Sequence, residues 1–84
     1  MTALPKFYLG AITILRHAEE ALRAAGETAA AYLYQHAYNT PDDAIDEDSA
    51  VTNAFALPNG ETLIVITDTT RTQTVLMTPE DRKT

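Results

Sequence analysis

A repeating stripe of apolar and small residues runs through the first half of the chain. Its members are separated alternately by four and three positions: Leu4, Tyr8, Ala11, Leu15, Ala18, Leu22, Ala25, Ala29, Tyr32 and His36. This spacing places the side chains on one face of an α-helix, and the abundance of alanine favours the same conformation. We therefore predict one long N-terminal helix over residues 4–38, bent or broken near Gly26, because a glycine inside a helix costs about 1 kcal/mol relative to alanine.

A short acidic segment follows the predicted helix. The run Thr40-Pro41-Asp42-Asp43 combines a capping residue, a proline suited to the first helical position and two acids suited to the positive end of a helix dipole. We predict a short helical turn within the acidic loop at residues 40–48. The run Thr78-Pro79-Glu80-Asp81 repeats this chemistry near the C-terminus.

The second half of the chain is patterned as strands. Residues 50–57, 61–67 and 72–78 are rich in β-branched and apolar side chains, and Pro58-Asn59-Gly60 is typical of a tight turn between the first two. The middle segment is apolar on both faces and should be the central strand. The expected fold is therefore α+β: a single domain over residues 1–84, with the long helix packed against a three-stranded antiparallel β-meander.

Two isoleucines of the central strand, Ile64 and Ile66, should lie on the face of the sheet opposite to the helix. In so short a chain they would form an exposed apolar surface, which is typical of a partner or dimer interface. The first interpretation is self-association through Ile64 and Ile66. The alternative is that the short acidic helix or the end of the long helix folds over them.

The charge of the chain is concentrated in its middle. Twelve acids against six bases give a formal charge of -6, and residues 24–70 contain no lysine or arginine. The densest group of acids is Asp42, Asp43, Asp46, Glu47 and Asp48. Such a patch repels nucleic-acid backbones and attracts basic surfaces. We therefore expect a basic protein partner and no direct binding of nucleic acid.

The residues needed for most catalytic or metal chemistry are missing from the sequence. There is no cysteine, Ser49 is the only serine, and the acidic segment lacks the glycine of a calcium-binding loop. No apolar run approaches the ~18 residues of a membrane helix, and the N-terminus lacks the pattern of a signal peptide. We expect a cytoplasmic protein that is not an enzyme, with no cofactor, no metal site and no membrane segment.

Aromatic residues cluster at the end of the predicted helix. Tyr34 and Tyr38 are four residues apart and should form a pair on one helix face. Simple packing of the helix end against the loop is the first interpretation of these tyrosines. The alternative is an interface role, because exposed tyrosines beside an acidic loop are typical of protein interfaces. His36 lies on the apolar stripe, which favours a half-buried position at the helix end over a role as a ligand or pH switch.

In size, acidity and the order of helix and strands, the chain resembles phage-encoded anti-CRISPR inhibitors. The acids between Glu27 and Asp68 carry this resemblance, and no sequence motif adds to it. The resemblance implies a non-enzymatic inhibitor that blocks a basic nucleic-acid channel on a CRISPR effector subunit. Its acidic patch would replace phosphates, with Tyr34 and Tyr38 as apolar anchors. The alternative is a homodimeric structural, assembly or antitoxin-like module.

Overall fold

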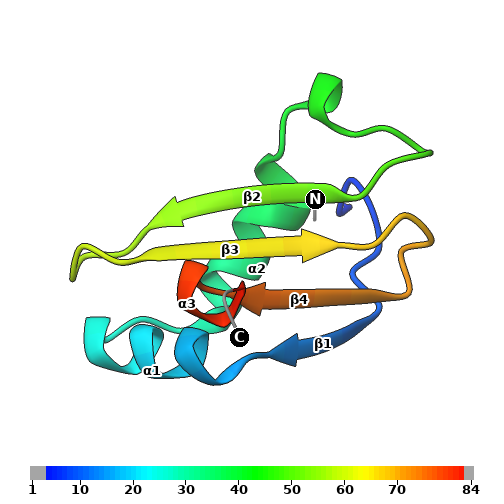
Figure 1. The fold of residues 1–84 in the computed structure, drawn as a ribbon. Helices are drawn as coiled ribbons and strands as arrows, with labels where there is room; N and C mark the ends of the chain where they lie inside the picture. The colour runs from blue at the N-terminus through cyan, green and yellow to red at the C-terminus, as the bar shows by residue number, and fades with distance from the viewer. Residues whose placement is uncertain (1–3, 83–84) are drawn as a thin grey trace.

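The computed structural model describes residues 4–82 and forms a small α+β fold (Figure 1). Its elements in chain order are β1 (Ala11–Ile14), α1 (Arg16–Ala25), α2 (Ala29–Asn39), the 3₁₀ turn η1 (Asp42–Ala44), β2 (Val51–Ala56), β3 (Thr62–Thr67), β4 (Gln73–Met77) and α3 (Pro79–Arg82). The three strands of the predicted meander are therefore present, and a strand that the sequence did not predict precedes the helices.

The four strands form one mixed sheet in the order β1-β4-β3-β2. Strands β2, β3 and β4 pair antiparallel through short turns, with Val65 of the central strand opposite Asn53 and Leu76. Strand β1 is parallel to β4, and Ile14 lies opposite Leu76. The first strand of the chain therefore forms one edge of the sheet, and β2 forms the other (Figure 1).

The prediction of one long N-terminal helix is wrong: a strand, β1, lies within the predicted span, and two separate helices, α1 and α2, follow it. The two helices are divided at Gly26, the position where a bend or break was expected. This residue adopts the left-handed conformation, with φ 71° and ψ 26°. Its N–H donates to the Arg23 carbonyl, and the N–H of Glu27 donates to the Leu22 carbonyl. These two bonds form a Schellman motif, which ends a helix and satisfies its last carbonyl groups. The apolar spacing continues in phase across Gly26, but the chain turns there and α2 starts anew.

Residues 4–15 are also not helical. The run Ile12-Thr13-Ile14 is β-branched and pairs with β4 instead. Just before it, Gly10 has φ 67°, and a Cβ atom at this position would lie 2.2 Å from the carbonyl oxygen of Thr72. A glycine therefore allows the backbone of the first segment to approach the β3–β4 turn, and long-range pairing overrides the helical spacing of this segment.

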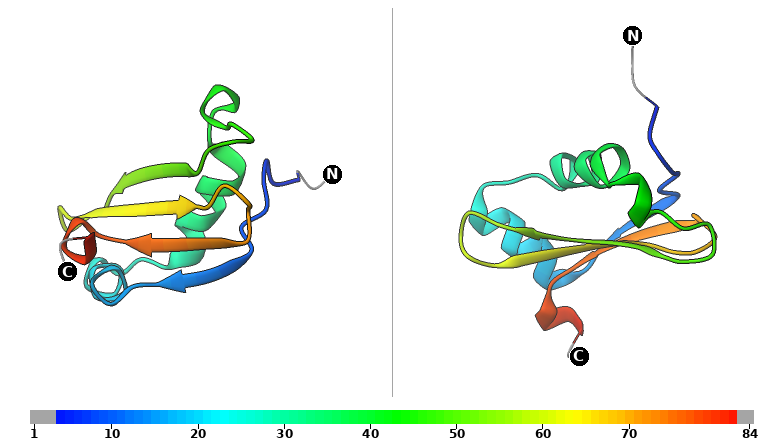
Figure 2. Two further views of the ribbon diagram at one scale, coloured as in Figure 1. Left: turned by 45° about the vertical axis from the view of Figure 1, so that its right-hand side comes forward. Right: turned by 90° about the horizontal axis from the view of Figure 1, so that it is seen from above.

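Helices α1 and α2 cover one face of the sheet and enclose the core (Figure 2). Leu63, Val65 and Leu76 are fully buried there, against Ala18 and Leu22 of α1. Leu76 thus points towards the helices. Leu76 lies opposite Val65 in the register, so it shares the helix-covered face, whereas Ile64 and Ile66 lie on the other face.

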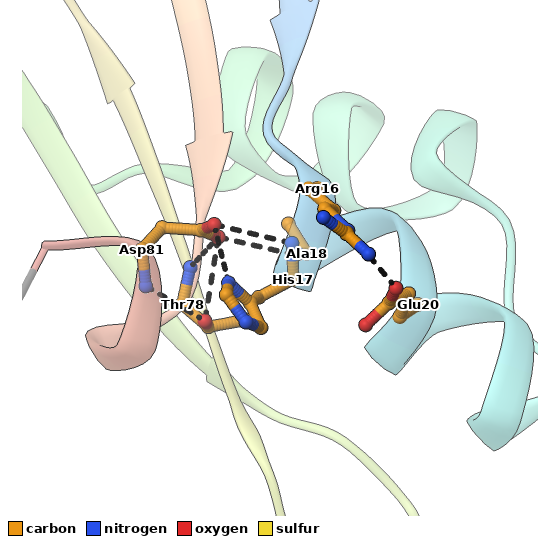
Figure 3. Close-up of polar contacts among 6 residues, drawn as sticks. All are labelled: Arg16, His17, Ala18, Glu20, Thr78 and Asp81. Carbon is orange, nitrogen blue, oxygen red and sulfur yellow. Dashed lines mark hydrogen bonds and ion pairs between the residues drawn. The ribbon is translucent and has the colours of Figure 1, made fainter. Parts of the chain in front are cut away.

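The short helix α3 lies on the opposite face of the sheet (Figure 2), and one of its residues also holds α1. The carboxylate of Asp81 accepts hydrogen bonds from the backbone N–H groups of His17 and Ala18, each at 3.1 Å, and from the N–H of Thr78 at 3.0 Å (Figure 3). Leu15, which precedes α1, offers no side-chain cap. Asp81 therefore caps α1 from the other end of the chain while it completes a capping box with Thr78.

Candidate functional site

The five clustered acids lie on an exposed loop beyond one edge of the sheet. The acidic segment predicted at residues 40–48 is part of the connection between α2 and β2, residues 40–50, which stands above the β2 edge in Figure 1. From here on, the acidic loop means this whole connection. Its helical part is shorter than predicted, since η1 spans only Asp42–Ala44. The group that we predicted as a partner-binding patch is exposed throughout: Asp42, Asp43, Asp46, Glu47 and Asp48.

Arg71, in the turn between β3 and β4, holds the backbone of the acidic loop. Its Nη1 donates to the Ser49 carbonyl at 2.9 Å, and its Nη2 donates to the Asp46 carbonyl at 2.8 Å. Arg71 itself has φ 59°, an uncommon conformation for a residue other than glycine. Because the guanidinium binds carbonyl oxygens, it fixes the loop without occupying the carboxylates.

The carboxylates of the loop divide into partnered and free groups. Asp42 pairs with the Lys6 ammonium at 2.9 Å, although its side chain is 90% exposed. Asp46 accepts a bond from the N–H of Asp48 at 2.9 Å. Within residues 4–82, the carboxylates of Asp43, Glu47 and Asp48 have no hydrogen-bond or ion-pair partner. These three acids are therefore available to an external cation.

The predicted pairing of Tyr34 with Tyr38 is confirmed. Their rings stack with centroids 4.4 Å apart and an interplanar angle of 17°. Tyr34 is 56% exposed and Tyr38 is half-buried. The stack lies on the last two turns of α2, which lead directly into the acidic loop. Its role as an anchor for a partner stays a prediction.

Ile64 and Ile66 share the face of the sheet on which α3 lies, opposite to α1 and α2 (Figure 2). Ile64 is only 8% exposed, whereas Ile66 is half-buried. Ile64 therefore offers little surface to a second molecule. Self-association through this pair stays a prediction.

A buried polar network centred on His36 was not predicted from the sequence. This residue is fully buried rather than half-buried, and each ring nitrogen has a partner. Nε2 lies 2.8 Å from the Thr67 hydroxyl, and Nδ1 lies 2.7 Å from the side-chain nitrogen of Asn53. The same Asn53 nitrogen donates to the Thr40 hydroxyl at 2.8 Å, and that hydroxyl donates to the His36 carbonyl. No periodicity in the sequence could indicate these contacts, because they join three separate elements.

The Leu9 carbonyl can only accept, and this fixes the direction of each bond from His36 Nε2 through Thr67 and Thr74. The Thr40 hydroxyl donates to the His36 carbonyl, so it accepts from the Asn53 amide nitrogen, which therefore also donates to Nδ1. The Thr74 hydroxyl donates to the Leu9 carbonyl at 2.7 Å, so it must accept from Thr67, 2.7 Å away. The Thr67 hydroxyl has then used its only proton and must accept from Nε2 of His36. His36 is therefore neutral, with its proton on Nε2 and an acceptor at Nδ1 for the Asn53 amide.

The network is connected to Arg71 through Phe7. The Phe7 ring contacts His36 edge-on, with centroids 5.0 Å apart, and the Arg71 guanidinium lies 5.6 Å above the Phe7 ring. Burial, and secondarily the positive charge of Arg71, lower the pKa of His36 from 6.5 to about 4. The segment before β1, the end of α2 and the acidic loop are thus tied to one buried cluster.

The surface formed by residues 4–82 includes two hollows of different size. The larger, of about 290 Å³, lies between β1, α1 and the start of α2, and its apolar wall comes from Ile14, Leu22 and Ala29. The smaller, of about 180 Å³, is lined by residues that include Glu61, Thr78 and Glu80. Across the described part of the chain, no three histidine, aspartate or glutamate side chains converge as a metal site would require.

No helix among residues 4–82 has the length and apolar character to cross a bilayer. Comparison with known proteins adds no further assignment, because the chain matches no protein-family model, no curated protein and no solved structure.

Proposed function

We propose that this chain is a non-enzymatic inhibitor that binds a basic, nucleic-acid-handling protein through its acidic loop. The observation that carries the proposal is the display of five exposed acids on a loop whose backbone is fixed by Arg71. Because the loop is ordered before binding, less conformational entropy is lost when a partner docks. Clustered carboxylates then take the positions that nucleic-acid phosphates would occupy on the partner.

The surroundings of the loop fit such an interface. The stacked Tyr34–Tyr38 pair supplies a rigid aromatic surface at the end of α2, and tyrosine is enriched among the residues that dominate binding energy. A net charge of -6 would speed association with a basic partner and make binding weaken as salt is added. The resemblance to anti-CRISPR inhibitors favours a CRISPR effector subunit as the partner, in the cytoplasm of a bacterial host.

The test uses the three acids that have no internal contacts. The loop variant is D43N/E47Q/D48N, and the matched control is E19Q/E20Q/E61Q, which changes the net charge equally at exposed positions elsewhere. Tagged proteins are used to capture partners from a nuclease-treated bacterial lysate, at about 50 mM and about 500 mM NaCl. We expect the unmodified chain and the control to capture nucleic-acid-binding proteins at low salt, and the loop variant to lose them.

The captured protein is then purified and its binding to nucleic acid is measured with increasing amounts of this chain. Loss of nucleic-acid binding supports the inhibitor function. The proposal fails if the loop variant captures the same proteins as the control, or if the captured protein binds nucleic acid equally well when saturated with this chain.

A further inference from the structure

Strand β1 is bonded to the sheet along only one of its sides. The Ala11 N–H donates to the Thr72 carbonyl at 3.0 Å, and the Leu15 N–H donates to the Leu76 carbonyl at 2.9 Å. In a parallel ladder, residues that face the neighbouring strand alternate with residues that face away from it. The backbone N–H and C=O groups of Ile12 and Ile14 therefore point outward, along the open edge of the sheet.

The open edge is apolar and carries no charge. Ile12 is 42% exposed and Ile14 is 39% exposed, and both side chains lie on the helix-covered face, because they pair with Thr74 and Leu76. No charged residue or proline occurs in residues 7–15. Proteins that remain monomeric usually protect an edge strand with charges, proline or a bulge. The β1 edge relies only on its short length.

We propose that two copies of this chain associate edge to edge through β1, antiparallel, about a two-fold axis beside Thr13. In this register Ile12 of each copy lies opposite the partner's Ile14, and each such pair exchanges both backbone hydrogen bonds. Every outward-facing backbone N–H and C=O group of Ile12 and Ile14 then has a hydrogen-bond partner. The two four-stranded sheets become one continuous sheet.

The side chains also match in this register. Each Ile12 packs across the strands against the partner's Ile14, and β-branched pairs of this kind stabilise antiparallel strands. Ile14 additionally forms part of the wall of the 290 Å³ hollow, together with Leu22 and Ala29. The four isoleucines of the dimer would therefore extend an apolar surface that each copy already has.

The distribution of charge permits a second copy at this edge, because the strong negative charge of the chain lies elsewhere. Residues 4–23 hold Lys6, Arg16 and Arg23 against Glu19 and Glu20, a net of +1 in a chain of net charge -6. Both glutamates pair with arginines one turn away on α1, and one of these ion pairs is drawn in Figure 3. The acidic loop lies at the opposite, β2 edge (Figure 1). Two copies can therefore meet at β1 while their acidic loops stay far apart.

A dimer through β1 can form whether or not the acidic loop binds a partner, because the two surfaces lie at opposite edges of the sheet. It also places self-association at Ile12 and Ile14, instead of at Ile64 and Ile66. A dimer formed in this way would present its two acidic loops at the two ends of one extended sheet.

A single cysteine provides the sharpest test, because the chain contains none. Thr13 faces its own copy across the proposed axis as a non-hydrogen-bonded pair, for which Cα atoms are about 4.5 Å apart. Disulfides accept Cα separations of about 4.4–6.8 Å. We expect T13C to form a disulfide-linked dimer under mild oxidation. The matched control is A54C, at the middle of the exposed β2 edge, which should cross-link at least about tenfold more slowly.

Sedimentation equilibrium of the unmodified chain up to about 1 mM tests the same surface without a cross-link. We expect a dimer that I12K weakens by about tenfold or more, since lysine at an edge blocks strand pairing. T52K, on the β2 edge, should have no such effect. Circular dichroism reports whether I12K folds. If it does not fold, the cross-linking of T13C compared with A54C is the test. A chain that is monomeric throughout this range, or equal cross-linking of T13C and A54C, would overturn the proposal.

Discussion

Acid should destabilise this protein well above the pH at which its carboxylates titrate, because of His36. In the folded state the pKa of His36 is about 4, and in the unfolded chain it returns to 6.5. The unfolded state therefore binds a proton more readily, and the free energy of unfolding falls as the pH drops from 6.5 towards 4. The physical reason is burial of the ring, which disfavours its charged form, and secondarily the positive charge of Arg71. A proton on Nδ1 would also face the Asn53 amide, which donates a hydrogen bond itself.

The size of the effect follows from the two pKa values. Each unit of difference is worth 1.36 kcal/mol, so the change from 6.5 to about 4 corresponds to roughly 3 kcal/mol lost by pH 4. At about 0.05–0.15 kcal/mol per residue, a chain of 84 residues has a total stability of roughly 4–13 kcal/mol. Protonation of one side chain would therefore remove a large share of it.

Carboxylates contribute in a lower pH range. The pKa of Asp81 lies below its usual 3.8, because hydrogen bonds from Thr78 and His17 outweigh the opposing effect of burial. The pKa of Asp68 is lowered chiefly by the Thr72 hydroxyl. A carboxylate with a lowered pKa stabilises the fold above its unfolded value and loses this contribution as the pH falls through its folded value. A decline in the free energy of unfolding between pH 6.5 and 4.5 therefore reports the protonation of a histidine.

Urea unfolding between about pH 7.5 and pH 4.5 measures the change in stability, and NMR titration of the imidazole carbon-bound protons identifies the residue. We expect the free energy of unfolding of H17Q to fall with pH as it does in the unmodified chain, since His36 remains. N53D should reduce this decline, because a carboxylate beside Nδ1 would favour the protonated ring. A constant free energy of unfolding from pH 6.5 to 4.5, or a His36 ring that titrates near 6.5, would refute the reasoning.

Two further predictions concern contacts that join distant segments. G10A should cost about 3 kcal/mol or more in urea unfolding, because its Cβ would collide with the Thr72 carbonyl. G60A, also at positive φ but with open space around it, should cost only about 1–2 kcal/mol; similar losses would contradict this account. D81N should cost about 1.5–3 kcal/mol by weakening charged hydrogen bonds to the start of α1. Faster hydrogen exchange at the His17 amide would locate the effect, and unchanged exchange would count against it.

The antiparallel meander could be predicted because its signals are local. Pro58-Asn59-Gly60 specifies a tight turn, and the run Leu63-Ile64-Val65-Ile66 favours a central strand with apolar side chains on both faces. The exposed acids and the Tyr34–Tyr38 stack were equally local, since they depend on charge density and on one helical turn.

Features that depend on distant partners could not be predicted. Ile12-Thr13-Ile14 becomes a strand because β4 is available to pair with it, although the surrounding residues have helical spacing. From the sequence, Gly26 fits either a bend within one helix or the end of a helix. The left-handed conformation of this residue makes it a helix end. The His36 network joins α2 to hydroxyls on two strands, so it exists only once the sheet has assembled.

The parallel pairing of β1 with β4 has a consequence for biosynthesis. Ala11 leaves the ribosome 62 residues before its partner Gln73. At about 5–20 residues per second, this interval lasts roughly 3–12 s. During that time Ile12 and Ile14 lack both their neighbouring strand and the Asp81 cap of the helix that follows. The nascent chain therefore exposes this unpaired apolar segment during synthesis, and a chaperone that binds short apolar stretches would find a target there.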